Sequence, residues 1–239
     1  MIQANQVSKW FDGVQVLHDI NATFDTGKTN LIIGQSGSGK TVFMKCLIGL
    51  LTPEEGEIYY DERPFTQMTA QQRKELRMEI GMLFQGSALF DNETVLGNVM
   101  FPLKMFSPMS RQEQIERAQF CIRRVGLENA DNKYPSEISG GMQKRVAIAR
   151  ALVNNPAVIL ADEATGNLDT RTSFEILVLF QKLHAEGRTI IFVTHNPDIA
   201  HYASRNIELR DGRIIRNEVN DHILSAAEGL AALPKNTDE

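Results

Sequence analysis

The stretch Gly34-Gln35-Ser36-Gly37-Ser38-Gly39-Lys40-Thr41 decides the fold of this chain, because it fits the pattern G-x-x-x-x-G-K-[ST]. The apolar run Leu31–Ile33 precedes it, and a helix-like stretch, Lys40–Leu51, follows it. Glycines let backbone N–H groups surround a phosphate without Cβ clashes, and a helix N-terminus adds the positive end of its dipole. The stretch therefore predicts a loop that binds a nucleoside triphosphate, with Lys40 on the β- and γ-phosphates and the Thr41 hydroxyl on Mg²⁺.

Short apolar runs that are typical of strands alternate with helical patterns around this loop. One helical pattern places Ile176, Phe180 and Leu183 on a single face. Strands that alternate with helices indicate βαβ units. We therefore predict an α/β fold, a P-loop core whose mostly parallel sheet carries helices on both faces. The predicted core strands are Leu31–Ile33, Ile80–Phe84, Val158–Ala161 and Thr189–Val193.

Both ends of this core are predicted to carry antiparallel strands. Ile2–Val7 and Val16–Phe24 have strand patterns on either side of a turn at Asp12-Gly13. Ile207–Leu209 and Arg213–Arg216, which Asp211-Gly212 joins, predict a closing hairpin.

The stretch from about residue 86 to 140 has helical periodicity and little strand character. Ser110-Arg111-Gln112-Glu113 is a capping box that starts one of its helices. This pattern predicts a helical subdomain inserted into the α/β core. We expect one domain over residues 1–216 and a tail of loose helix and frayed end over 217–239.

The composition is that of an ordinary globular protein. The 239 residues are 42% hydrophobic and 23% charged, which excludes disorder, collagen and coiled coil as descriptions of the whole chain. The net charge of −5 argues against a nucleic-acid binder. No apolar run approaches the roughly 18 residues of a membrane span, so we expect a cytoplasmic chain that another chain brings to a membrane. Cys46 and Cys121 lie far apart among apolar residues, which predicts buried thiols.

Two adjacent carboxylates follow the apolar strand Ala157–Ala161. Parallel strands deliver their carboxyl ends to one crevice, so Asp162 and Glu163 are expected beside the phosphate loop. Asp162 would hold Mg²⁺ through its water shell, and Glu163 would accept a proton from the attacking water. The second carboxylate favours an ATPase over a kinase or a small GTPase.

A second anion site is predicted at Ile138-Ser139-Gly140-Gly141-Met142-Gln143, which precedes a helix. It lies far along the chain from the first, and one chain need not bring both to one phosphate. Two copies arranged head to tail could do so. With the phosphate loop and Asp162-Glu163 in this order, the chain resembles an ABC-type ATPase subunit over about residues 2–216.

The resemblance assigns further roles. It implies that Gln85 senses Mg²⁺ and the attacking water, and that His195 contacts the γ-phosphate and orients the catalytic Glu163. Asn167-Leu168-Asp169 falls at the family's D-loop, so Asp169 is expected at the nucleotide across a dimer interface. Phe11 matches the aromatic residue that stacks on adenine, with neighbouring Trp10 as its rival.

Three positions depart from the family's pattern without putting ATP hydrolysis in doubt. Met142 stands where Gln is usual, and Ala164 stands where Pro is usual. Phe11 replaces Tyr, which keeps a stacking face and loses a hydroxyl.

Two sets of residues point to different branches of the family. Leu83–Asp91 and Ser139-Gly140-Gly141-Met142 resemble the ATPase subunits of Mla-type phospholipid transporters, partners of lipid-binding MCE proteins. Ala161–Asp169 resembles instead the lipoprotein-release and cell-division type. The first resemblance involves more residues, and some of them fall in the region that faces a membrane subunit. We therefore expect a phospholipid transporter's ATPase, with the second type as the alternative and a soluble DNA-repair or ribosome-associated ABC ATPase disfavoured by the single acidic cassette.

The resemblance also implies cofactors and partners. A head-to-tail homodimer would sandwich two ATP molecules with Mg²⁺ and drive an integral membrane permease docked near Gln85–Phe106. An MCE lipid-binding protein and a small accessory protein would complete the complex, with no nucleic acid. The expected location is the cytoplasmic side of the inner membrane.

Overall fold

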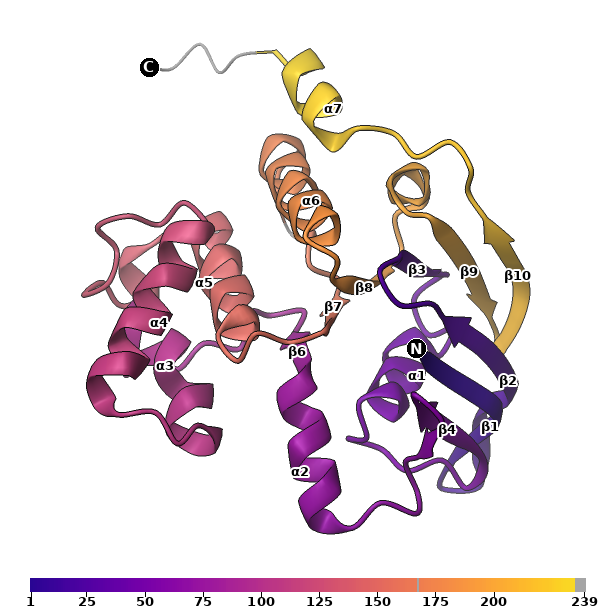
Figure 1. The fold of residues 1–239 in the computed structure, drawn as a ribbon. Helices are drawn as coiled ribbons and strands as arrows, with labels where there is room; N and C mark the ends of the chain where they lie inside the picture. The colour runs from indigo at the N-terminus through magenta and orange to yellow at the C-terminus, as the bar shows by residue number, and fades with distance from the viewer. Residues whose placement is uncertain (167, 235–239) are drawn as a thin grey trace.

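The computed structural model describes residues 1–166 and 168–234, which form two sheets and several groups of helices (Figure 1). The strands are β1 (Ile2–Phe11), β2 (Val14–Phe24), β3 (Thr29–Ile33), β4 (Glu55–Tyr60), β5 (Arg63–Pro64), β6 (Ile80–Leu83), β7 (Val158–Asp162), β8 (Thr189–Thr194), β9 (Arg205–Arg210) and β10 (Arg213–Val219). The α-helices are α1 (Lys40–Leu47), α2 (Ala70–Glu79), α3 (Val95–Phe106), α4 (Arg111–Arg124), α5 (Gly140–Leu152), α6 (Thr170–Ala185) and α7 (Ala226–Ala232). The 3-10 helix η1 (Pro135–Glu137) precedes α5, and the 3-10 helix η2 (Pro197–Tyr202) follows β8.

The larger sheet has the strand order β10-β9-β3-β8-β7-β6. All neighbours in it are parallel except β9 and β10, which form the closing hairpin. The predicted α/β core with a mostly parallel sheet is therefore confirmed. Because β3, β6, β7 and β8 run in parallel, their carboxyl ends lie at one edge of the sheet, where the phosphate loop begins.

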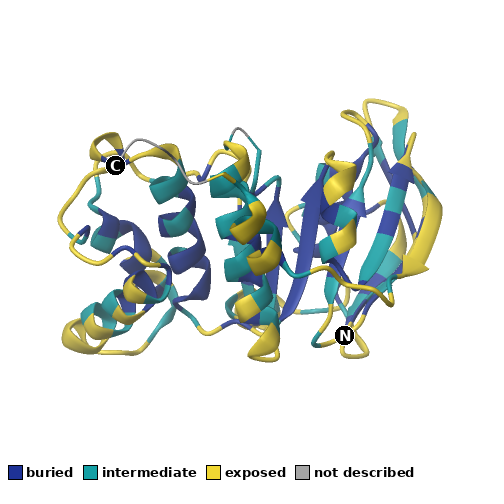
Figure 2. Cartoon of the chain, turned by 90° about the horizontal axis from the view of Figure 1, so that it is seen from above, coloured by how far each residue is buried: buried dark blue, intermediate teal, exposed yellow. Residues whose placement is uncertain are grey.

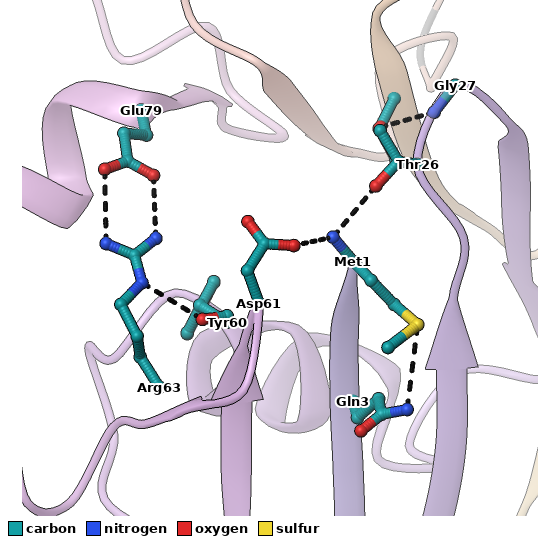
Figure 3. Close-up of polar contacts among 9 residues, drawn as sticks. Met1, Gln3, Thr26, Gly27, Tyr60, Asp61, Arg63 and Glu79 are labelled. Atoms are coloured by element: carbon teal, nitrogen blue, oxygen red, sulfur yellow. Dashed lines mark hydrogen bonds and ion pairs between the residues drawn. The ribbon is translucent and has the colours of Figure 1, made fainter.

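A smaller antiparallel sheet has the order β2-β1-β4-β5, and β1 pairs with β2 as expected. β4, β5 and α2 were not predicted. The ammonium group of Met1 donates to Thr26 Oγ1 at 2.9 Å and also contacts Asp61, so the first strand is tied to two turns (Figure 3). Arg63 pairs with Glu79 at 3.1 Å, which joins β5 to the end of α2 (Figure 3).

The central strands are buried on both faces, since neighbouring residues along them enter two different cores. Leu31 and Phe192 face a core that they share with helices α3 to α6. Ile32 and Val193 face a second core built with α1 and the antiparallel sheet. In Figure 2 the buried residues accordingly follow the strands and the inner faces of the helices. Burial on both faces explains why these strands are apolar runs without alternation.

Several local expectations have a clear outcome. The Ser110 capping box is confirmed, because its hydroxyl accepts from the Glu113 N–H at 3.4 Å while Glu113 accepts from the Ser110 N–H at 2.7 Å. Cys46 and Cys121 are buried free thiols, as predicted. The helix expected over Lys40–Leu51 ends earlier, at Leu47. Gly49 has φ +67°, which ends the helical path. Only glycine fits there, because a Cβ would lie 1.9 Å from the Phe65 ring.

The helical group from α3 to α5 lies to one side of the sheets in Figure 1, where a helical subdomain was expected. Its bounds and those of the whole domain stay a prediction. β10 runs on to Val219, past residue 216, and the tail then forms α7 against α6. Among the described residues, no helix combines the length and the apolar character that crossing a membrane requires.

Candidate active site

The phosphate loop connects β3 to α1 and is held by its own backbone. Gly39 caps the helix with φ +97°, a conformation that suits glycine. The Lys40 ammonium lies in the loop, where it donates to the carbonyl oxygens of Gly34 at 2.8 Å and Gln35 at 2.7 Å. Burial lowers the pKa of Lys40, while the charges of Glu163 and Asp162 oppose that shift.

One feature of the loop fixes its course against the rest of the protein, and a second fits it to phosphate. A Cβ on Gly34 would lie 2.1 Å from the Leu209 carbonyl oxygen, so only glycine allows this close approach. The buried Ser38 hydroxyl has no hydrogen-bond partner among the described residues. A buried polar group without a partner is costly, and a phosphate oxygen would supply the missing contact.

Oxygen donors suitable for Mg²⁺ meet at the start of α1. Thr41 Oγ1 lies 3.4 Å from Asp162 Oδ1, at the end of β7. Asp162 is only 5% exposed, and burial raises the pKa of its carboxyl group, helped by the neighbouring Glu163 charge and opposed by the Thr41 hydrogen bond. A hydroxyl and a carboxylate are hard oxygen ligands that leave room for water and phosphate oxygens, which is how Mg²⁺ binds. These two residues would hold the ion and neutralise charge on the phosphates.

The three predicted catalytic residues converge from the ends of three strands. Gln85 Nε2 donates to Glu163 Oε2 at 2.7 Å, and a hydrogen bond of 3.1 Å joins His195 Nδ1 to Glu163 Oε1. The Glu163 N–H donates to the Val193 carbonyl at 2.8 Å, and the residue has φ +45°. A left-handed backbone costs energy for a residue other than glycine, and such strain clusters at functional sites. The turn aims Glu163 differently from Asp162.

One cavity of about 590 Å³ brings these groups together. Residues of the phosphate loop line it with Gln85, Glu163 and His195. Val16 on β2 and Val42 on α1 also line it, and neither was predicted. Apolar residues at a nucleotide cavity offer a surface for a base or a ribose, yet no local pattern marks such residues in the sequence.

The two aromatic candidates for adenine stacking are not part of that cavity lining. Phe11 is 41% exposed at the end of β1, with the Lys9 ammonium 5.1 Å from its ring centroid. The Trp10 backbone N–H donates to Glu54 Oε2 at 2.9 Å. The choice of Phe11 over Trp10 stays a prediction.

The second anion site lies at the start of α5. Ser139 caps this helix by accepting from the Met142 N–H at 3.3 Å, and Ser139 and Gly140 are exposed. None of Ser139, Gly140 and Gly141 is among the described residues that line the cavity. The two predicted anion sites of one chain therefore do not share this cavity.

Asp169 is also outside the cavity lining. It caps α6, where it accepts from the Thr172 N–H at 2.9 Å and from the Thr172 hydroxyl at 2.5 Å. These hydrogen bonds, the side-chain one first, hold the pKa of Asp169 below its ordinary value. Asn167, the first residue of the predicted D-loop, lies outside the described residues.

Comparison with known proteins settles the family. Residues 17–166, more than half of the chain, match the family described as ABC transporter. The chain belongs to the ABC transporter ATP-binding family. The uncharacterized ABC transporter ATP-binding protein YvrO of Bacillus subtilis is 40% identical over 92% of this chain and 98% of its own length. A macrolide export ATP-binding/permease protein MacB of Shewanella is 42% identical over 92% of this chain, which spans only 33% of that relative.

Solved structures agree with this ABC assignment. The dimeric ATP-binding cassette MJ0796 in a post-hydrolysis state with ADP and Pi has a TM-score of 0.84 and 36% identity, covering 92% of this chain and 98% of that one. CbiO1 of Clostridium perfringens, part of the transporter complex cbiONQ, has a TM-score of 0.83 and 30% identity over 97% and 90%. This ABC chain is thus an ATPase that binds ATP with Mg²⁺.

Proposed function

We propose that Glu163 is the general base of ATP hydrolysis and that Gln85 and His195 position it. The observation that carries the assignment is that both carboxylate oxygens of Glu163 are held, one by each neighbour. A base fixed on two sides presents its remaining lone pairs in a defined direction, which is what proton abstraction from a water molecule needs. Lys40, Thr41 and Asp162 would hold the phosphates and Mg²⁺ beside it.

We infer further that two copies act head to tail. Ser139 and Gly140 of the second anion site are exposed, and none of Ser139–Gly141 lines the nucleotide cavity of the same chain. A second copy could present the site to the bound nucleotide. Asp169, at the start of α6, would approach the same interface. ATP would then favour the closed dimer because it contacts both copies only there.

Replacement of Glu163 by Gln tests the base. We expect a loss of turnover of about 10²–10⁴-fold, the usual contribution of a general base, with ATP binding retained. The matched control is Glu128→Gln, which removes an exposed carboxylate elsewhere. Measured ATPase activity and nucleotide titration check the result, and turnover retained in Glu163→Gln would refute the role.

A crosslinking experiment tests the arrangement of the dimer. Ser139→Cys and Ser36→Cys are prepared as separate chains that also carry Glu163→Gln, and the two are mixed with MgATP. The native thiols Cys46 and Cys121 are buried, so they compete little. We expect a covalent pair that joins one chain of each kind only with nucleotide. Equal crosslinking without ATP, or none with it, would contradict the head-to-tail sandwich.

The permease is proposed to dock beside Gln85. A cavity of about 440 Å³ opens between the parallel sheet and the helical group, and exposed aromatic side chains surround it. Its lining includes the exposed Phe84, Phe90 and Phe101 and the half-buried Phe106. An amphipathic helix from a membrane subunit is the kind of partner that such an aromatic groove accepts.

We propose phospholipid as the cargo, at the cytoplasmic side of the inner membrane. The support is the resemblance of Leu83–Asp91 and Ser139–Met142 to Mla-type subunits, and Phe84 and Phe90 of the first segment line the docking cavity. Such a complex would also contain an MCE lipid-binding protein and a small accessory protein. The macrolide exporters are much longer than this chain, so their printed cargo is not carried over.

Purification of the native complex tests this cargo. The chain is isolated with its permease and placed in vesicles that contain a fluorescent phospholipid, with Glu163→Gln as the matched inactive complex. We expect ATP-dependent movement of the phospholipid and an MCE protein among the copurifying chains. Movement of a lipid-anchored protein or of a macrolide instead would assign the complex to another branch.

A further inference from the structure

The loop that carries Gln85 is held by a buried lysine on another element. Lys144 of α5 is only 4% exposed, and its ammonium donates to the carbonyl oxygens of Phe84, at 3.4 Å, and of Gln85. The side chain of Gln85 in turn donates to Glu163. Two hydrogen bonds, one to the backbone and one from the side chain of Gln85, therefore link α5 to the proposed base.

A second cation of α5 holds the next part of the loop. Arg150 donates to the carbonyl oxygens of Ser87 at 2.6 Å and Ala88 at 2.7 Å. Ser87 has φ +61° and Ala88 has φ +46°, both in the left-handed region that favours glycine. The guanidinium thus stabilises two consecutive residues in a conformation that their own side chains oppose.

A buried cation needs a reason, because removing an ammonium group from water is expensive. Burial lowers the pKa of Lys144, and the charges of Asp162 and Glu163 oppose that shift. An apolar residue of similar size would fill this position at lower cost in stability. The Lys144 ammonium instead donates hydrogen bonds to carbonyl oxygens of the 84–88 loop. We therefore attribute the buried charge to the need to hold this loop in one conformation.

We propose that Lys144 is a positioning residue, which with Arg150 clamps the 84–88 loop to α5 and thereby sets Gln85 against Glu163. This inference rests on the proposed roles of Gln85 and Glu163. It adds a connection, because α5 begins at the Ser139–Gly141 site where the partner copy's nucleotide is proposed to bind. Occupation of one ATP site would reach the base of the other through α5 and Lys144.

The test compares Lys144→Met, which removes the cation and keeps the length, with Lys144→Arg, which keeps donors for both carbonyl oxygens. The matched control is Lys182→Met at an exposed lysine of α6. We expect Lys144→Met to lower kcat about tenfold or more, since small displacements of a positioned group cost up to about 100-fold. KM for ATP should change less than twofold, and Lys144→Arg should restore most of kcat.

Two outcomes would overturn the proposal. One is an unchanged kcat in folded Lys144→Met, and the other is an equal loss in Lys144→Met and Lys144→Arg that follows the thermal midpoint. If Lys144→Met does not fold, Lys144→Ala replaces it under the same criteria, because alanine removes every side-chain donor and is the best helix former. Failure of the underlying assignment is a separate result, since it shows as retained turnover in Glu163→Gln.

Discussion

Two loops at the same edge of the parallel sheet are held in different ways. The phosphate loop follows β3, and its contacts are mainly with its own backbone and with the β9–β10 hairpin, where the Gly212 N–H donates to the Ser38 carbonyl at 3.1 Å. The 84–94 loop follows β6, and its backbone is held by side chains of the helical group. Lys144 and Arg150 bind its first part, and buried Asn98 of α3 accepts from the Phe90 N–H at 2.8 Å.

The difference separates a fixed site from an adjustable one. The phosphate loop should keep its shape wherever the helical group lies, because its described hydrogen bonds come from its own residues and from the β9–β10 hairpin. The 84–94 loop can keep its shape only while these helices stay near. Movement of the helical group would therefore displace Gln85 and leave Lys40 in place. ATP could then bind at Lys40 before Gln85 positions Glu163 for hydrolysis.

The largest effect is expected where the phosphate loop has no room to adjust. In Gly34→Ala, the new Cβ would lie 2.1 Å from the Leu209 carbonyl oxygen and 2.7 Å from Ser38 Oγ. We expect the free energy of unfolding to fall by about 3 kcal/mol, as overpacking against backbone does, and ATP affinity to fall at least about 100-fold. Denaturant unfolding without nucleotide and ATP titration measure the two effects.

The control lies in the other loop. A Cβ on Gly86 would meet nothing within 4 Å, and Gly86 lies directly after Gln85. Gly86→Ala should change the free energy of unfolding and the free energy of ATP binding by less than about 0.5 kcal/mol each, as at an unconstrained surface position. Similar losses in the two variants would show that the phosphate loop is no more rigid than its neighbour.

An intermediate effect is expected from removing the Arg150 hydrogen bonds to the 84–94 loop. Arg150→Met deprives the Ser87 and Ala88 carbonyl oxygens of their donor, and we expect a loss of about 2 kcal/mol in the free energy of unfolding. Adding Ala88→Gly should recover about 1 kcal/mol, because glycine adopts the left-handed conformation without strain. Arg213→Met, at an exposed arginine of β10, is the control.

Denaturant unfolding measures the loss of stability, and limited proteolysis near residues 84–91 measures how well Arg150 protects the loop. Faster cleavage in Arg150→Met than in the control is expected, with protection regained in the double variant. If Ala88→Gly instead lowers stability further, the left-handed backbone is not the source of the strain and the role given to Arg150 is wrong.

The sequence allowed the fixed loop to be predicted more fully than the adjustable one. The phosphate loop depends on glycines and a lysine that are close in the chain, so a local pattern carries its geometry. Lys144 and Arg150 act on backbone carbonyl oxygens some sixty residues away, and no residue type at the receiving end marks such a contact. Val16 went unpredicted for the same reason, because only the fold brings β2 to the cavity.

The fold shows the same division. The core strands were predictable because burial on both faces requires apolar runs, and the hairpins because Asp-Gly turns lie between strand patterns. β4 was missed because it pairs with β1 across a long separation. The capping box of α2, in which Thr69 accepts from the Gln72 N–H at 3.3 Å, is a signal that could have placed that helix. The meeting of Gln85, Glu163 and His195 followed from the family resemblance, because each residue alone is ambiguous.

The smallest effect on stability concerns Asp162. This residue connects the two loops, because it contacts Thr41 beside the phosphate loop and precedes Glu163, which binds Gln85. Burial raises the pKa of this carboxyl group, so its charged form opposes folding. Asp162→Asn removes that charge, and we expect the free energy of unfolding of the nucleotide-free protein at pH 7 to rise by about 1 kcal/mol. Mg²⁺-dependent hydrolysis should be lost in the same variant.

The pH dependence separates this cause from a simple change in packing. Since the folded-state pKa lies above the unfolded value, the folded protein binds the proton more readily. The penalty that Asp162 adds to the wild type therefore shrinks as the pH falls through the folded-state pKa toward the unfolded one. Once its Asp162 is protonated, the wild type carries a neutral group as the variant does, so the advantage of Asp162→Asn should disappear. Unfolding curves at pH 7 and below measure the difference, with Asp221→Asn as an exposed control. If Asp162→Asn stayed more stable than the wild type at acid pH, the gain would come from contacts of the new amide and not from removal of the charge. The buried Asp162 carboxylate would then not be what lowers the stability of the nucleotide-free protein.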